Sequence, residues 1–254
     1  MMKGESVVEE KSLFEALKQN GIVSFDVGLT ETEVRSVKEV SIEHWLSDFN
    51  HYGVIDKTLE HKLEAHFGRL EGNIEETIKT IARFVTRITE KMRADFKQDA
   101  VWLTVRTSLP NTEFHIPRWH QDGDFLSDQN GNPLSEEYKL VFTLKGAQTR
   151  FAEIINTERF EHYQTEEDAN NTDLQNSTID PVLYQEKELA LRKNLMNTVQ
   201  ETFPAQDGQA TIYRVGGNQG KVHSEPEINE SRIFMSVIVG SAVQITELRT
   251  RFET

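Results

Sequence analysis

The sequence predicts an α+β fold, in which a mainly helical first part precedes a part built from short strands. Up to about residue 99, apolar side chains recur at the spacing of amphipathic helices. From residue 100 onward, segments rich in β-branched and aromatic residues alternate with turns. The 254 residues contain no internal repeat and no clear linker. We therefore expect one domain over 1–254, with a mainly helical layer at 1–99 and, at 100–250, a core whose strands form a sandwich or a barrel.

The first residues are expected to form a helix, a strand and a second helix. The segment KSLFEALKQNG has apolar residues at helical spacing and ends on a glycine, and IVSFDV is typical of a short strand. The segment TETEVRSVKEVSIEHWL predicts the second helix, with Thr30 or Thr32 as its N-cap.

The longest helix is predicted from about Ile74 to Phe96, where an isoleucine-rich stripe repeats every three or four residues. Asn73, followed by Glu76, resembles a capping box at the start of this helix. A stripe of this kind indicates a face that packs on the rest of the protein.

The strands of the core are expected between strong turn signals such as DQNGNP and GGNQG. The segments typical of strands are AVWLTVRTSL, KLVFTLKGA, TRFAEII, QATIYRV, KVHSEP and SRIFMSVIVG.

An insertion at about 156–203 interrupts these strands. Residues 156–180 are polar and acidic, which predicts a surface insertion or a mobile loop. The following segment, PVLYQEKELALRKNLMNTVQETF, predicts a helix.

The composition excludes several classes of function. The 28 basic and 42 acidic residues give a net charge of −14, a poor match for nucleic acid or an anionic membrane. Without cysteine there can be no disulfide, zinc–thiolate site or thiol catalysis, so a transition-metal site must use His, Asp or Glu. The N-terminus lacks the apolar core of a signal peptide, and IFMSVIVG is too short to span a bilayer. We therefore expect a cytoplasmic protein without a membrane partner.

Four residues predict a metal centre beside an anion-binding arginine. The segment RWHQDGDF places His120 two residues before Asp122, and residues two apart on an extended strand point to the same face. His223 lies in GKVHSEP, and Arg232 follows it by nine residues. Two imidazoles and one carboxylate occupy one face of an octahedral Fe(II) and leave the opposite face open. An arginine on the next strand can bind a dicarboxylate through paired hydrogen bonds.

The order HQD, then VH, then SR resembles the Fe(II)/2-oxoglutarate-dependent dioxygenase superfamily. The opening segment LKQNGIVSFDVGLTETEVRSV is similar to that of phytanoyl-CoA-hydroxylase-like and prolyl-hydroxylase-like members. The resemblance covers roughly residues 10–40 and 100–245 and identifies no subfamily. It implies a double-stranded β-helix (jelly-roll, cupin-like) core with an N-terminal helical layer and a helical insertion.

The resemblance also implies a cofactor and a co-substrate. His120, Asp122 and His223 would hold Fe(II), and 2-oxoglutarate would chelate the metal through its 2-oxo acid end. Arg232 would pair with the distal carboxylate. The implied reaction uses molecular oxygen to hydroxylate a C–H bond of a small-molecule or side-chain substrate, and it releases succinate and carbon dioxide. Because halogenase relatives lack the carboxylate ligand, Asp122 favours hydroxylation, demethylation or desaturation.

Lys139 and Thr143 are further candidates for binding 2-oxoglutarate. They lie on the strand after the HQD turn and share one face by the two-residue period. Some relatives use a residue on this strand for the 2-oxoglutarate carboxylate.

Other interpretations of these residues stay open. Arg106, Arg150 and Arg214 are rival anchors, since each lies on a predicted strand. The chain could be a cupin-type protein that binds metal without 2-oxoglutarate, although such proteins typically place more than two histidines around one metal. It could also be a non-catalytic jelly-roll binding domain.

Overall fold

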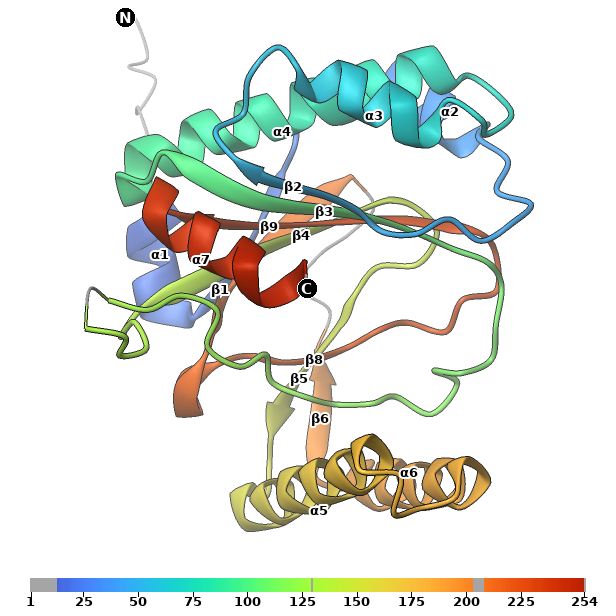
Figure 1. Cartoon of the computed structure of the whole chain (residues 1–254), viewed down its shortest axis with the longest axis vertical. Helices are drawn as coiled ribbons and strands as arrows, with labels where there is room; N and C mark the ends of the chain where they lie inside the picture. Colours follow the sequence, from blue (N-terminus) through green and yellow to red (C-terminus); the bar gives the residue numbers. More distant parts are fainter. Residues whose placement is uncertain (1–12, 129, 203–207, 254) are drawn as a thin grey trace, which may run out of the picture.

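Two antiparallel sheets and seven α-helices make up the part of the chain that the computed structural model describes, residues 13–128, 130–202 and 208–253 (Figure 1). The larger sheet has the strand order β1-β7-β4-β9-β3-β2, and the smaller sheet has the order β6-β5-β8. The predicted α+β class is therefore confirmed. The strands are β1 (Ile22–Asp26), β2 (Phe49–Gly53), β3 (Ala100–Ser108), β4 (Glu137–Lys145), β5 (Arg150–Ile154), β6 (Val199–Thr202), β7 (Gln209–Val215), β8 (Val222–Ser224) and β9 (Arg232–Gly240). The helices are α1 (Leu13–Asn20), α2 (Glu31–Lys38), α3 (Leu59–Phe67), α4 (Ile74–Phe96), α5 (Thr157–Gln175), α6 (Pro181–Leu195) and α7 (Ala242–Phe252).

The helices form separate layers around the two sheets. Helix α4 lies over one face of the larger sheet, and α2 and α3 pack against α4 (Figure 1). The smaller sheet lies on the other side of the larger sheet, and α5 and α6 pair with each other beyond it. No helix among the described residues is long and apolar enough to cross a membrane.

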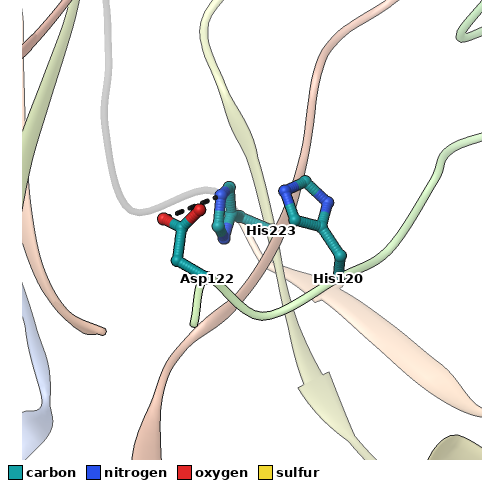
Figure 2. A group of neighbouring side chains, drawn as sticks. All are labelled: His120, Asp122 and His223. Atoms are coloured by element: carbon teal, nitrogen blue, oxygen red, sulfur yellow. Dashed lines mark ion pairs between the residues drawn. The ribbon is translucent and has the colours of Figure 1, made fainter. Parts of the chain in front are cut away.

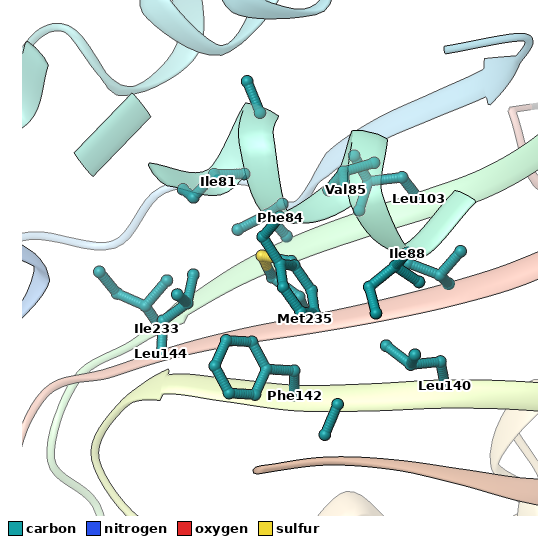
Figure 3. Close-up of a cluster of buried hydrophobic side chains, with 14 of the residues drawn as sticks. Ile81, Phe84, Val85, Ile88, Leu103, Leu140, Phe142, Leu144, Ile233 and Met235 are labelled. Carbon is teal, nitrogen blue, oxygen red and sulfur yellow. The ribbon is translucent and has the colours of Figure 1, made fainter. Parts of the chain in front are cut away.

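The main core lies between α4 and the larger sheet, where the predicted apolar stripe is buried (Figure 3). The rings of Phe84 on α4 and Phe142 on β4 lie 4.6 Å apart, centroid to centroid. Since successive strand residues point to opposite faces, Leu140 and Phe142 face α4, and the alternate residues Lys139 and Val141 line the cavity between the two sheets. This alternation supplies the larger sheet's side of the candidate site.

The structure confirms some local predictions in the first half and corrects others. Helix α4 has the predicted bounds, and Thr30 forms a capping box with Glu33 at the start of α2. The capping box predicted at Asn73 was wrong, because the Asn73 side chain makes no cap hydrogen bond. Helix α2 ends at Lys38, well before the end of the segment predicted as helix.

Among the described residues up to 99, two segments form strands of the larger sheet. Residues 49–53 were not predicted as a strand, yet β2 forms one edge of the larger sheet and the correctly predicted β1 forms the other. Residues 11 and 12 of the first predicted helix lie outside the described residues. The end of the chain, where no element was predicted, forms α7.

The acidic segment at 156–180 was predicted as a surface insertion or a mobile loop, and most of it forms helix α5. Its buried positions Phe160, Tyr163, Glu167 and Asn170 follow helical spacing, but two of them are strongly polar. Tyr163 donates to Glu167 over 3.2 Å, and Asn170 donates to Glu188 of α6 over 3.2 Å. A buried helix face that is satisfied by hydrogen bonds leaves little hydrophobic signal. The end of the next predicted helix was also wrong, because β6 occupies 199–202; residues 203–207 are not described.

Candidate metal centre

His120 and His223 lie directly opposite each other on two neighbouring antiparallel segments. The backbone N–H of His120 donates to the carbonyl of His223 over 3.0 Å, and the reverse hydrogen bond is 2.9 Å long. The segment that carries His120 thereby runs along β8, at the free side of the smaller sheet. The imidazole centroids are 4.3 Å apart, and Asp122 follows on the same segment as His120 (Figure 2).

In both imidazoles, Nε2 is the ring nitrogen that can bind a metal. Nδ1 of His120 lies 2.9 Å from the carbonyl oxygen of Arg118, and Nδ1 of His223 lies 3.1 Å from that of Lys221. A carbonyl only accepts, so in each neutral ring Nδ1 carries the proton and Nε2 has the lone pair that a metal needs. Burial, helped by the neighbouring His120, holds the pKa of His223 well below its usual value, so this ring is neutral at neutral pH.

Asp122 supplies the negative charge of the group. Burial on its own would raise the pKa of Asp122, but neighbouring groups, chiefly the charged and hydrogen-bonded Lys139, outweigh burial and hold that pKa below its usual range. Oδ2 accepts hydrogen bonds from Lys139 Nζ and from the Tyr213 hydroxyl, each over 2.9 Å. No hydrogen bond from a described residue reaches Oδ1. The carboxylate is therefore ionised and held by one oxygen.

The three residues fit a divalent metal ion. One ligand atom from each of His120, Asp122 and His223 can be chosen so that all lie within 4.8 Å of one another. Two neutral imidazole nitrogens and one carboxylate oxygen are a donor set that divalent iron and neighbouring transition metals accept. The fold thus brings the three predicted ligands together.

A cavity of about 430 Å³ lies between the two sheets. It is lined by His120, Asp122 and His223, which together are called the metal-binding group below. Arg232 lines the same cavity and is only 3% exposed. Its Nε donates to the carbonyl of Ala147 over 2.9 Å, and its Nη2 lies 3.3 Å from the hydroxyls of both Thr143 and Thr149. Nη1 makes no hydrogen bond to a described residue. Burial lowers the pKa of Arg232 to about 10, so the guanidinium stays charged at neutral pH and keeps a donor for an anionic ligand.

The other two residues predicted to bind 2-oxoglutarate, Lys139 and Thr143, contact other residues of the site. Lys139 lines the cavity but pairs with Asp122. Thr143 is buried and contacts Arg232 through its hydroxyl. Both residues stay candidates for the 2-oxoglutarate site, Lys139 next to Asp122 and Thr143 next to Arg232.

The rival arginines are engaged elsewhere. Arg150 forms an ion pair with Glu201, and Arg214 donates to Gln219 and to the carbonyl of Ser135. Arg106 does line the cavity, where it pairs with Asp48 over 2.8 Å. Among the described residues, Arg232 is the one of the four that combines deep burial with a place in the cavity and forms no ion pair, although the charge of Glu225 acts on it.

Tyr213 was missed from the sequence, although it contacts the metal-binding group. Its ring is fully buried on β7, and its hydroxyl lies 2.9 Å from Asp122 Oδ2 and 3.3 Å from His223 Nε2. The signal available was the alternation in QATIYRV, which puts Tyr213 on the face opposite to Ile212. Which of the two faces met the cavity could not be read from that segment alone.

The comparison with known proteins found similarity in structure only. No family model matches the chain, and no curated protein matches its sequence. A prolyl-4-hydroxylase from Pseudomonas putida has 9% identity and a TM-score of 0.43, over 90% of this chain and 96% of that one. The dioxygenase for auxin oxidation 1 from Arabidopsis thaliana, in complex with 2-oxoglutarate, has 9% identity and a TM-score of 0.39, over 89% and 85%. HygX from Streptomyces hygroscopicus, with nickel and 2-oxoglutarate bound, has 12% identity and a TM-score of 0.40, over 89% and 85%. Similarities this distant do not place the chain in a family.

Proposed function

We propose that this protein is an Fe(II)- and 2-oxoglutarate-dependent oxygenase that hydroxylates a C–H bond of a small-molecule or side-chain substrate, with release of succinate and carbon dioxide. The observation that carries the proposal is that His120, Asp122 and His223 share one cavity with the buried, charged Arg232. A metal-binding protein that does not use 2-oxoglutarate has no need of a desolvated guanidinium there, because burying a charge that forms no ion pair is costly.

The proposal includes a double-stranded β-helix core within a single domain. From β3 onward, the chain passes back and forth between the two sheets, if the His120 segment is counted with the smaller sheet. The larger sheet then receives β3, β4, β7 and β9, and the smaller sheet receives the His120 segment, β5, β6 and β8. A jelly roll with two Greek keys has this pattern. Strands β1 and β2 then extend the larger sheet at its two edges.

Each residue of the site has a defined task in this proposal. The two histidines and Asp122 hold the metal, which when bound supplies the activation of oxygen and the chelation of the 2-oxo acid. Arg232 binds the distal carboxylate of 2-oxoglutarate through Nη1, while Thr143, Thr149 and the Ala147 carbonyl hold the guanidinium plane in place.

The first experiment is an anaerobic titration of 2-oxoglutarate into the Fe(II)-loaded protein, followed by the visible charge-transfer absorption of the metal-bound 2-oxo acid. We expect a saturable band that is absent in His223→Ala. In Arg232→Met, the 2-oxoglutarate concentration at half-saturation should rise by at least about tenfold, since a charge-assisted hydrogen bond is lost. Arg214→Met is the matched control, because Arg214 donates to Gln219 and Ser135, outside the cavity.

Two results would count against the proposal. Metal that binds and is lost in His120→Ala, but gives no band with 2-oxoglutarate, would favour a metal-binding protein that does not use this co-substrate. The absence of any bound metal would leave a jelly-roll binding domain. A positive titration would be followed by a screen for substrates that stimulate succinate release.

A further inference from the structure

Lys139 occupies an unusual place for a cation, because it contacts the carboxylate of the metal-binding group. Its Nζ lies 2.9 Å from Asp122 Oδ2, and both side chains are largely buried, with 16% and 13% of their surface exposed. Its Nζ also lies 5.5 Å from the centroid of the Phe125 ring. A divalent ion bound through the free Oδ1 would therefore have a fixed ammonium close by.

The sheet register separates Lys139 from Arg232 along the cavity. Lys139 pairs with Ile238 in the ladder between β4 and β9, whereas Thr143, which contacts Arg232, pairs with Phe234. Four strand residues span about 13 Å, so the two cations approach the cavity from positions well apart. Of these two cations, only Lys139 contacts a member of the metal-binding group. The two cations are thus placed to meet the two different ends of a dicarboxylate.

We propose that Lys139 couples metal binding to the binding of the 2-oxo acid. Resting on the proposed function, this inference assigns Lys139 to the chelating end of 2-oxoglutarate rather than to its distal carboxylate. The ammonium adds a positive charge beside the site of a dication, which weakens the binding of the metal alone. The same charge favours a negatively charged chelate on that metal. Lys139 therefore makes a bound 2-oxo acid raise the affinity for the metal, and by reciprocity the metal raises the affinity for the 2-oxo acid by the same factor.

A purely structural role for Lys139 makes a different prediction. If Lys139 only held Asp122 in place, its loss would weaken metal binding both with and without the 2-oxo acid. If it anchored the distal carboxylate, its loss would affect 2-oxoglutarate but not pyruvate, which has the 2-oxo acid end alone. The coupling role predicts opposite changes for the metal alone and for the metal with its chelate, and it predicts them for pyruvate as well.

The test measures Mn²⁺ affinity by calorimetry, without ligand, with saturating 2-oxoglutarate and with saturating pyruvate. The variants are Lys139→Met, which loses charge and hydrogen bond, and Lys139→Gln, which keeps a donor for Oδ2. We expect Lys139→Met to bind Mn²⁺ alone at least as tightly as the unchanged protein. The factor by which either ligand raises Mn²⁺ affinity should fall on the order of tenfold, within the range usual for such couplings. Lys139→Gln should show the same fall, because it is the charge that couples.

Lys145→Met is the matched control. Lys145 lies at the far end of the same strand, and its Nζ donates to the carbonyl of Val40, so its loss removes a charge without touching the cavity. Arg232→Met should reduce the coupling for 2-oxoglutarate but leave the coupling for pyruvate unchanged.

The results separate this inference from the proposed function. Coupling factors that stay within twofold in Lys139→Met, while the unchanged protein shows coupling, would overturn the role of Lys139 alone. Weaker binding of Mn²⁺ in every condition would overturn it too, in favour of a structural role. A protein that binds no metal, or binds it without any effect of 2-oxoglutarate, would overturn both.

Discussion

The hydroxyl of Tyr213 on β7 donates a hydrogen bond to Oδ2 of Asp122 over 2.9 Å, so a second strand of the larger sheet holds the carboxylate that Lys139 contacts from β4. The two donors share Oδ2, and no hydrogen bond from a described residue reaches Oδ1. Removing an uncharged donor such as Tyr213, which orients a metal ligand without adding charge, typically lowers metal affinity about 10- to 100-fold.

Tyr213→Phe should therefore weaken metal binding by roughly tenfold while the protein stays folded. The phenyl ring keeps its edge contact with Phe151, whose centroid lies 5.1 Å away, and Lys139 still neutralises Asp122. Mn²⁺ calorimetry measures the affinity, and chemical denaturation measures the stability. Tyr138→Phe is the matched control, because it loses the same hydroxyl on the opposite face of β4, against Phe96. Equal affinities in both variants would show that the Tyr213 hydroxyl does not position the carboxylate.

Metal should stabilise the folded protein through the three ligands. A ligand that binds only the folded state at a hundredfold excess over its dissociation constant adds about 2.7 kcal/mol to the free energy of unfolding. We expect a gain of this size with Mn²⁺ in the unchanged protein and none in His120→Ala. The exposed His115, five residues earlier, provides the control, since it lies outside the metal-binding group. A gain that persists in His120→Ala would place the bound ion elsewhere.

The candidate metal ligands could be predicted from the sequence because residue type and short spacing are visible in it. His120 and Asp122 lie two residues apart, His223 precedes Arg232 by nine, and the fold brings all four to one cavity. The contacts of Tyr213 and Lys139 with Asp122 could not be predicted, since they depend on the order β9-β4-β7, which pairs segments far apart in the chain. Sequence periodicity shows that a strand has two faces, but only the tertiary arrangement decides which one meets the cavity.

The elements that were missed share a physical cause. Helix α5 buries Glu167 and Asn170 through hydrogen bonds instead of apolar contact, so hydropathy indicates a surface loop. Strand β2 is short and carries a buried histidine, His51, and its hydrogen bonds come from pairing with β3. Helix α4 was predicted to the residue because one long apolar face decides its packing without help from distant segments.

The free energy of unfolding should fall as the pH rises, because of the buried Glu137. Its carboxylate accepts backbone N–H groups of Phe125 and Leu126 over 3.1 Å, which ties the loop after Asp122 to the start of β4. Burial raises the pKa of Glu137 from 4.5 to about 7, against the effect of these N–H groups. The folded state therefore binds this proton more tightly than the unfolded chain, so the stabilisation is fully present below the unfolded pKa and is lost as the pH rises through about 7.

The measurement is the free energy of unfolding from about pH 4.5 to 8, compared between the unchanged protein and Glu137→Gln. The neutral amide cannot ionise, so the difference between the two curves should change with pH by up to roughly 3 kcal/mol. Comparing the curves removes the contribution of groups that titrate alike in both proteins. Parallel curves would mean that Glu137 ionises in the folded protein much as it does in the unfolded chain.

Phe84 should be a main determinant of stability that leaves the metal centre unchanged. Its ring is 1% exposed on α4 and packs at 4.6 Å on Phe142, whose strand carries Lys139 on the opposite face. Phe84→Ala removes this buried ring, and such truncations cost about 3–5 kcal/mol of the free energy of unfolding. Trp45→Ala, at a side chain that is 73% exposed, should cost about 0.5 kcal/mol or less. Because the sheet separates the core from the cavity, folded Phe84→Ala should bind Mn²⁺ with nearly unchanged affinity. A loss of affinity parallel to the loss of stability would mean that packing of α4 on the sheet sets the geometry of the metal ligands.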